Sequence, residues 1–61
     1  MEIDDVEDYL NTIVVHMAVL NEWEESFIKN MVMKHENHET FTFKQLFHID
    51  KIYNKVENRY R

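Results

Sequence analysis

Hydrophobic residues recur along the first third of the chain at alternating spacings of three and four positions. This spacing marks one face of an amphipathic helix, or the seam of a coiled coil. The pattern predicts a first helix over about residues 4–20, with several acidic side chains in its first turns. Its apolar stripe consists of Ile3, Val6, Leu10, Ile13, Met17 and Leu20.

The stripe stops at position 24, where the same heptad phase reaches a glutamate. Asn21 can accept a backbone N–H as an N-cap, and Glu24 stands where the reciprocal partner of a capping box lies. These two residues predict a break near Asn21 and a second helix over about residues 22–35. An uninterrupted helix over 4–35 is the alternative, because no glycine or proline forces the break. The second helix has an apolar face made of Trp23, Phe27, Ile28, Met31 and Val32.

The stretch HETFTFKQL, residues 38–46, has the features of a helix start. Thr42 and Gln45 are spaced as a capping box, and Phe41 and Leu46 are spaced as a hydrophobic staple. A third helix is therefore expected over about residues 43–58, after a short polar connection. The sequence predicts an all-α fold in a single domain over 1–61, a small three-helix arrangement with a C-terminal helical hairpin. The seam of the last helix consists of Leu46, Ile49, Tyr53, Val56 and Tyr60.

The region from residue 13 to residue 20 is apolar almost all the way round the first helix. A helix of this kind is buried on more than one side, and two further short helices can hardly enclose it. A chain of 61 residues without cysteine also has a small core and gains no disulfide. We therefore expect a homodimer or partner interface at Val15, Ala18 and Val19. Wide contact with the core, plus ordinary exposed apolar surface, is the alternative.

Charge is unevenly distributed along the chain. Residues 1–26 carry eight acids and no base, whereas residues 27–61 carry four acids and seven bases. On the last helix, five residues with basic side chains fall within about 80° of one another, opposite the seam and flanked by Phe47 and Ile52. A stripe of this kind is typical of nucleic-acid contacts, and Phe47 could stack on a base of single-stranded DNA. The alternative is a solvated face, or one docked on the acidic half of a neighbouring chain. The basic stripe consists of Lys44, His48, Lys51, Lys55 and Arg59.

Catalytic and metal-binding signals are weak. His35 and His38 are three positions apart rather than the four of a zinc-protease helix, so we expect neither a metal nor another cofactor. Ser26 is the only serine, and carboxylates at an open helix end have nothing to shift their pKa. We expect a non-enzyme without a small-molecule substrate. The most apolar stretch is far shorter than the roughly 20 residues of a membrane span, so a cytoplasmic protein without membrane contact is expected.

The segment from Trp23 to Val56 resembles a helical-hairpin module of small phage-encoded proteins. The shared pattern is Trp23-Glu-x-x-Phe-Ile, then Phe41-Thr-x-Lys-Gln, then Ile49-x-x-Ile-Tyr-x-Lys-Val. Such modules are associated with phage recombination, repair and replication, including companions of the T4-type recombination helicase. In the family the connection carries a glycine or basic residues, whereas here residues 36–40 are acidic. The resemblance implies a hairpin and a location in the host cytoplasm.

Three functions remain open on these grounds. The first is an accessory protein that docks on a protein of the DNA recombination or replication machinery and weakly contacts single-stranded DNA. The second is an acidic inhibitor of a host enzyme, in which Asp4, Asp5 and Asp8 imitate DNA phosphates. The third is a purely structural helical dimer, for which neither set of charges matters.

Overall fold

The computed structural model describes residues 5–59, and within this range it contains helices and no strand. The helices are α1 (Val6–Val15), the short 3-10 helix η1 (Met17–Val19), α2 (Glu22–Glu36) and α3 (Phe43–Arg59). The predicted all-α fold with three α-helices is therefore confirmed. Ile3 and Tyr60, which were assigned to apolar stripes, lie outside the described residues.

The first helix is shorter than predicted. Asp5 caps α1 by accepting the backbone N–H of Asp8 at 3.0 Å, but the α-helix ends at Val15 instead of continuing to residue 20. His16 leaves the helical conformation at φ −115°, and the chain makes one 3-10 turn before Leu20 becomes extended. Four consecutive β-branched residues over 12–15 weaken the helix locally. The 3-10 turn that follows lets Met17 and the residues up to position 20 fold back onto the core.

The predicted break at Asn21 is confirmed, which excludes the uninterrupted helix. The side chain of Asn21 accepts the backbone N–H of Glu24 at 2.8 Å, and the Glu24 carboxylate accepts that of Asn21 at 3.0 Å. At its other end α2 closes with a Schellman motif, in which the N–H of Glu39 donates to the Lys34 carbonyl. His38 occupies the left-handed position of this motif at φ 59°.

The predicted start of α3 is confirmed as a capping box. The backbone N–H of Gln45 donates to the Thr42 hydroxyl at 3.1 Å. In return, the side-chain oxygen of Gln45 accepts the backbone N–H of Thr42 at 2.9 Å. Phe41 is partly buried against the core. Its staple contact with Leu46 remains a prediction.

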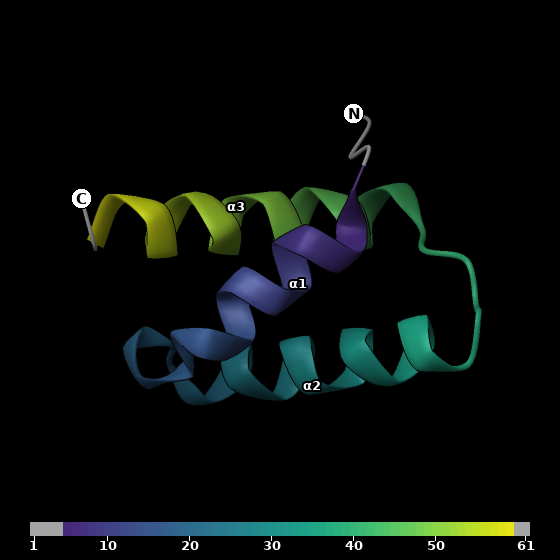
Figure 1. Cartoon of the computed structure of the whole chain (residues 1–61), viewed down its shortest axis with the longest axis horizontal. Helices are drawn as coiled ribbons and strands as arrows, with labels where there is room; N and C mark the ends of the chain where they lie inside the picture. The colour runs from purple at the N-terminus through teal and green to yellow at the C-terminus, as the bar shows by residue number, and fades with distance from the viewer. Residues whose placement is uncertain (1–4, 60–61) are drawn as a thin grey trace.

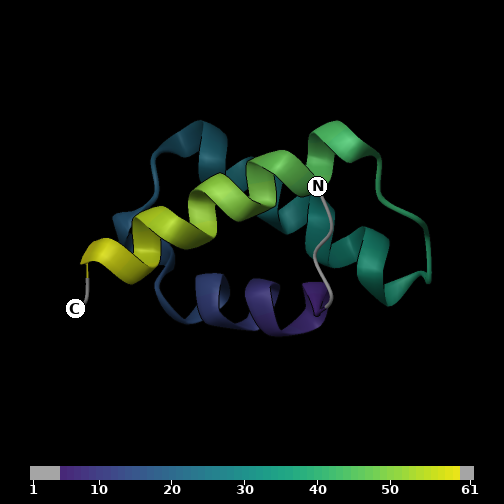
Figure 2. The same cartoon turned by 90° about the horizontal axis from the view of Figure 1, so that it is seen from above.

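The helices α2 and α3 run in opposite directions along the long axis and are joined by the loop 37–42, while α1 crosses obliquely between them (Figure 1). Seen from above, α1 lies on one side of the α2–α3 hairpin, and the first turn of α2 lies away from it (Figure 2). The main helix contacts accordingly join α1 to α3 and α1 to α2. The rings of Tyr9 and Tyr53 stack across α1 and α3 with centroids 4.0 Å apart.

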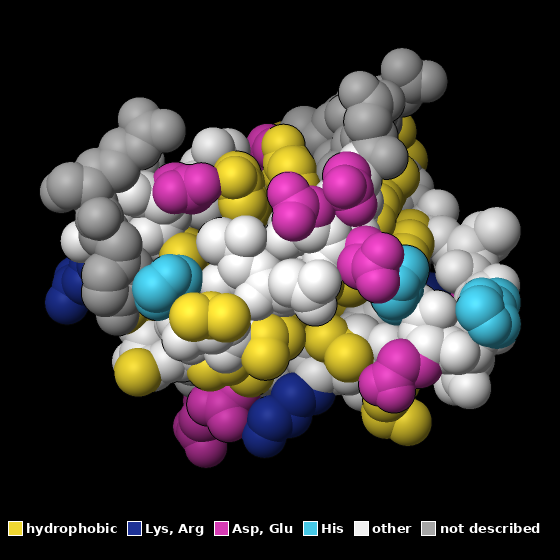
Figure 3. All heavy atoms as spheres, in the orientation of Figure 1, with side chains coloured by type: hydrophobic (Ala, Val, Ile, Leu, Met, Phe, Trp, Pro, Cys, Tyr) yellow, Lys and Arg dark blue, Asp and Glu magenta, His cyan; other side chains and the backbone are white. Residues whose placement is uncertain are grey.

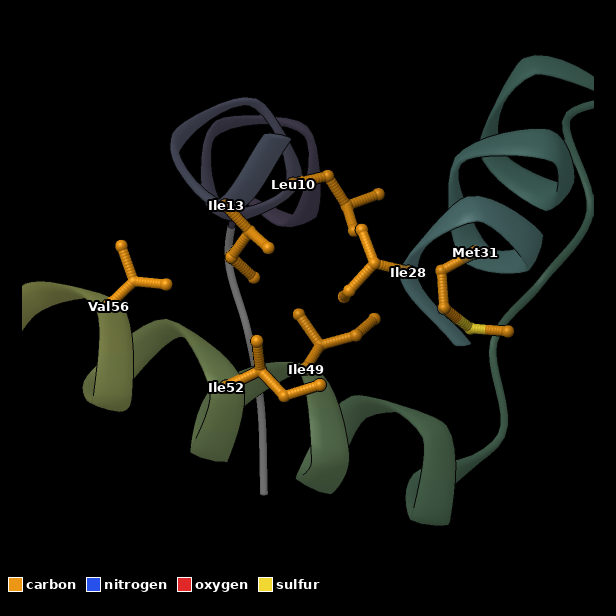
Figure 4. Packing of buried hydrophobic residues seen from close by; sticks show 7 residues of the cluster. All are labelled: Leu10, Ile13, Ile28, Met31, Ile49, Ile52 and Val56. Atoms are coloured by element: carbon orange, nitrogen blue, oxygen red, sulfur yellow. The ribbon is translucent and has the colours of Figure 1, made fainter. Parts of the chain in front are cut away.

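The core is formed where the three helices converge (Figure 4). Each isoleucine buried in this way stabilises the fold by about 1.5–3 kcal/mol. Ile52, which is expected beside the basic stripe, is instead buried in a cluster that also contains Ile13 of α1 and Ile28 of α2. Trp23, assigned to the apolar face of the second helix, is exposed. The buried residues are Leu10, Ile13, Ile28, Met31, Ile49, Ile52 and Val56.

Candidate interaction surfaces

The basic stripe predicted on α3 is divided by the packing of α2. Lys44, Lys51 and Arg59 are exposed. Lys55 is also exposed, but it donates to the Glu24 carboxylate on α2 at 2.7 Å, and His48 is partly buried among aromatic rings. Within residues 5–59, no carboxylate lies within ion-pair distance of Lys44, Lys51 or Arg59. Two of the five stripe residues therefore contact α2, and the other three form no ion pair within this range.

Glu24 joins the start of α2 to the last half of α3. One oxygen, Oε1, accepts both the backbone N–H of Asn21 and the Nζ of Lys55. Partial burial raises the pKa of this carboxyl, but the hydrogen bonds from Lys55 and Asn21 outweigh that effect, and the net pKa lies below its usual value. The carboxylate is thus held in its charged form by the same two contacts that fix the helices.

His48 lies at the centre of an aromatic cluster. Its ring meets the rings of Trp23, Phe27 and Phe47 edge-on, with centroids 5.5, 5.7 and 5.9 Å away. The Trp23 and Phe27 rings stack on each other at 5.3 Å, and the Nζ of Lys51 lies 5.4 Å from the Phe47 ring centroid. Edge-to-face and cation–π arrangements of this kind each contribute about 0.5–1.5 kcal/mol. These contacts restrict the orientations of the four rings within the folded chain.

This cluster extends into an exposed surface, which we name the aromatic–lysine face. Trp23 is 58% exposed, Phe43 64% and Phe47 41%, although large aromatic side chains usually supply core area. The sequence pattern missed Trp23 because helical periodicity placed it with the core of α2. The available signal was its position in the first helical turn, beyond the reach of α1. The face consists of Trp23, Phe27, Phe43, Lys44, Phe47, His48 and Lys51.

A second apolar surface lies on the other side of α2, where α1 and α2 form a groove of about 390 Å³. Of the predicted interface residues, Val15 and Ala18 are exposed near this groove, whereas Val19 is partly buried against the core. Val15 and Ala18 are thus available for an interface, whereas Val19 contributes to the core. The groove is lined by Val14, Met17, Ile28, Lys29, Val32 and Met33.

The remaining candidate residues are distributed over the surface. His35 lies 3.9 Å from the Glu7 carboxylate, and no group of three or more potential metal ligands occurs within residues 5–59. Asp5 is occupied as the cap of α1, Asp8 is exposed, and Asp4 lies outside the described residues. None of the helices over the described range is long and apolar enough to cross a membrane.

Comparisons of the chain with protein-family models, with curated proteins and with solved structures find no match. The resemblance of residues 23–56 to the phage helical-hairpin module therefore stays a prediction.

Proposed function

We propose that the chain is a non-enzymatic accessory protein that binds a partner protein through the aromatic–lysine face. The observation that carries this proposal is the exposure of Trp23 and Phe47 on either side of a histidine that both rings contact, with the exposed Phe43 one helical turn before Phe47. Following the resemblance of residues 23–56, the partner is a protein of the DNA recombination or replication machinery. The host cytoplasm is the compartment in which such a partner is met.

The composition of the face favours a protein interface. Exposed aromatic side chains that form a contiguous patch are characteristic of binding sites, and tryptophan is prominent among the residues that dominate binding energy. The stacking of Trp23 on Phe27 and of Lys51 over Phe47 restricts these side chains in the free protein. Less conformational entropy is then lost on binding.

The charge of the face indicates the charge of the partner. Lys44 and Lys51 lie beside the exposed rings and form no ion pair within residues 5–59, whereas Lys55 is neutralised by Glu24. A partner segment with apolar side chains for the rings and carboxylates for the two lysines is complementary to this surface. An acidic amphipathic helix has both properties on one face.

Single-stranded DNA is the less favourable ligand. Of the basic stripe, Lys44, Lys51 and Arg59 are exposed and form no ion pair within residues 5–59, whereas the exposed Lys55 is paired with Glu24. Three such cations are enough for roughly three phosphate contacts. The chain as a whole carries a net charge of −5, which repels a polyanion at low ionic strength. A protein segment needs only the local charge and gains the apolar contacts in addition.

Photo-crosslinking tests the proposal. A photoreactive phenylalanine analogue replaces Phe47 in the full chain, and a control protein carries it in place of Asn11, an exposed residue of α1. Both are produced in cells that encode the chain, irradiated, and the crosslinked segment is identified by mass spectrometry. We expect position 47 alone to label an acidic, apolar segment of a recombination or replication protein.

Other outcomes contradict the proposal in distinguishable ways. Crosslinks to DNA only would show that the basic stripe binds nucleic acid instead. The same labelled proteins from positions 47 and 11 would show that the face has no special role. If the labelled segment is basic, the proposal that the partner segment is acidic would be contradicted.

A further inference from the structure

We propose that a second copy of this chain covers the groove between α1 and α2. The groove is a separate surface from the aromatic–lysine face, because the two share no residue. The groove lies between α2 and the segment formed by α1 and η1, whereas the face lies between α2 and α3. The inference is therefore independent of the proposed function.

The apolar surface extends beyond the groove itself. Met33 on its wall is 61% exposed, and Val15, one position beyond the lining residue Val14, is 75% exposed. In the space-filling view, hydrophobic side chains gather over the junction of α1 and α2 on the side that α1 covers (Figure 3). A contiguous apolar band on a chain with only seven buried core residues within 5–59 indicates a surface that is covered in the working molecule.

The shape of this surface favours a second copy as the occupant. A projecting apolar side chain, Val15, and an apolar groove lie at the same junction of one chain. A two-fold axis presents the projection of each copy to the groove of the other, as in an isologous dimer. The contact between Val15 of one copy and the groove of the other then occurs twice in the dimer.

The charges at the rim support the same occupant. Lys29 lines the groove and pairs with Glu25 one turn earlier on α2, at 3.0 Å. The rim therefore presents both signs of charge side by side, and a two-fold rotation brings each sign within reach of its opposite. A partner with one dominant charge would meet repulsion from one of these two residues.

A stable interface buries about 800 Å² on each partner, and its apolar centre would consist of Val15, Met33 and the residues that line the groove. Burial of additional apolar area also matters more for a chain of this length, whose core alone supplies little stability.

Sedimentation velocity on the full chain, over roughly 1 μM to 1 mM, tests the proposal, because binding between folded copies follows mass action. We expect a monomer–dimer equilibrium for the wild type. Met33→Lys and Val15→Lys each place a charge in the interface and should weaken dimerisation at least tenfold. Asn58→Lys, which adds the same charge at an exposed site on α3, should dimerise as the wild type does.

Far-UV circular dichroism verifies that each variant keeps its helices, which is expected because both replaced side chains are mostly exposed. A wild type that stays monomeric over the whole range would overturn the proposal. Equal dimerisation of Val15→Lys and Asn58→Lys would also overturn it, since the dimer would then form elsewhere. Neither result bears on the aromatic–lysine face.

Discussion

The Nζ atom of Lys55 on α3 lies 2.7 Å from the Oε1 atom of Glu24 on α2, and this same oxygen accepts the backbone N–H of Asn21. A helix cap and an interhelix ion pair are thus combined in one carboxylate. The pairing fixes the first turn of α2 against α3, and with it the position of Trp23 beside His48. It also neutralises one lysine of the basic stripe.

Replacement of Glu24 by glutamine separates the two roles of this carboxylate. Glutamine keeps an oxygen that accepts the Asn21 N–H but loses the charge that attracts Lys55. We expect Glu24→Gln to lower the free energy of unfolding by about 0.5–1 kcal/mol, and Glu24→Ala by about 1 kcal/mol more. Thermal unfolding at neutral pH measures both changes. Equal stability of the two variants would contradict the dual role.

The pH dependence of this difference has a defined sign. Because the pKa of Glu24 is lower in the folded protein, its charge stabilises the fold above the ordinary carboxyl pKa, and this contribution is lost as the pH falls through the folded value. The wild type should therefore exceed Glu24→Gln in melting temperature at pH 7, and the gap should close in acid. A gap that widens in acid would show that the pKa is raised.

The left-handed backbone of His38 offers a site for stabilisation. A side chain with a Cβ atom at φ 59° is strained by about 1–2 kcal/mol, whereas glycine is not. Allowing for the extra entropy of glycine in the unfolded chain, His38→Gly should stabilise the protein by about 0.5–1 kcal/mol. The melting temperature should rise by several degrees. His38→Ala, which keeps the Cβ atom, is the control and should give no such gain.

The capping box at the start of α3 should contribute measurably to stability. Thr42→Ala removes the hydroxyl that accepts the Gln45 N–H, and should lower the free energy of unfolding by about 1 kcal/mol. Phe41→Ala removes a partly buried ring and should lower it by a similar amount. Thr40→Ala, at an exposed position two residues before the cap, serves as control. Melting curves of Thr42→Ala and Thr40→Ala that coincide would contradict the role of the cap.

Helix starts could be predicted from this sequence because their determinants are local. A cap and its partner are three residues apart, so Asn21 with Glu24 and Thr42 with Gln45 could be recognised without knowledge of the tertiary fold. The end of α1 at Val15 was missed because no glycine or proline marks it. There the α-helix gives way to a 3-10 turn whose side chains pack against the core.

The candidate surfaces could be predicted only in part, because they depend on which helix covers which side of α3. Helical periodicity gave the angular position of Lys55 correctly but not its partner on α2. It placed Ile52 beside the stripe, although this side chain is buried with apolar side chains of α1 and α2. The exposure of Trp23 likewise follows from the position of α1 on one side of the hairpin.

The proposal that the aromatic–lysine face binds an acidic partner segment is tested by calorimetric titration of the chain with the segment that the photoreactive protein labels. Phe47→Ala and Lys51→Glu should each weaken binding at least tenfold, which corresponds to about 1.4 kcal/mol. Asn11→Glu, on the exposed side of α1, should bind as the wild type does. Unchanged affinity in both Phe47→Ala and Lys51→Glu would contradict the claim.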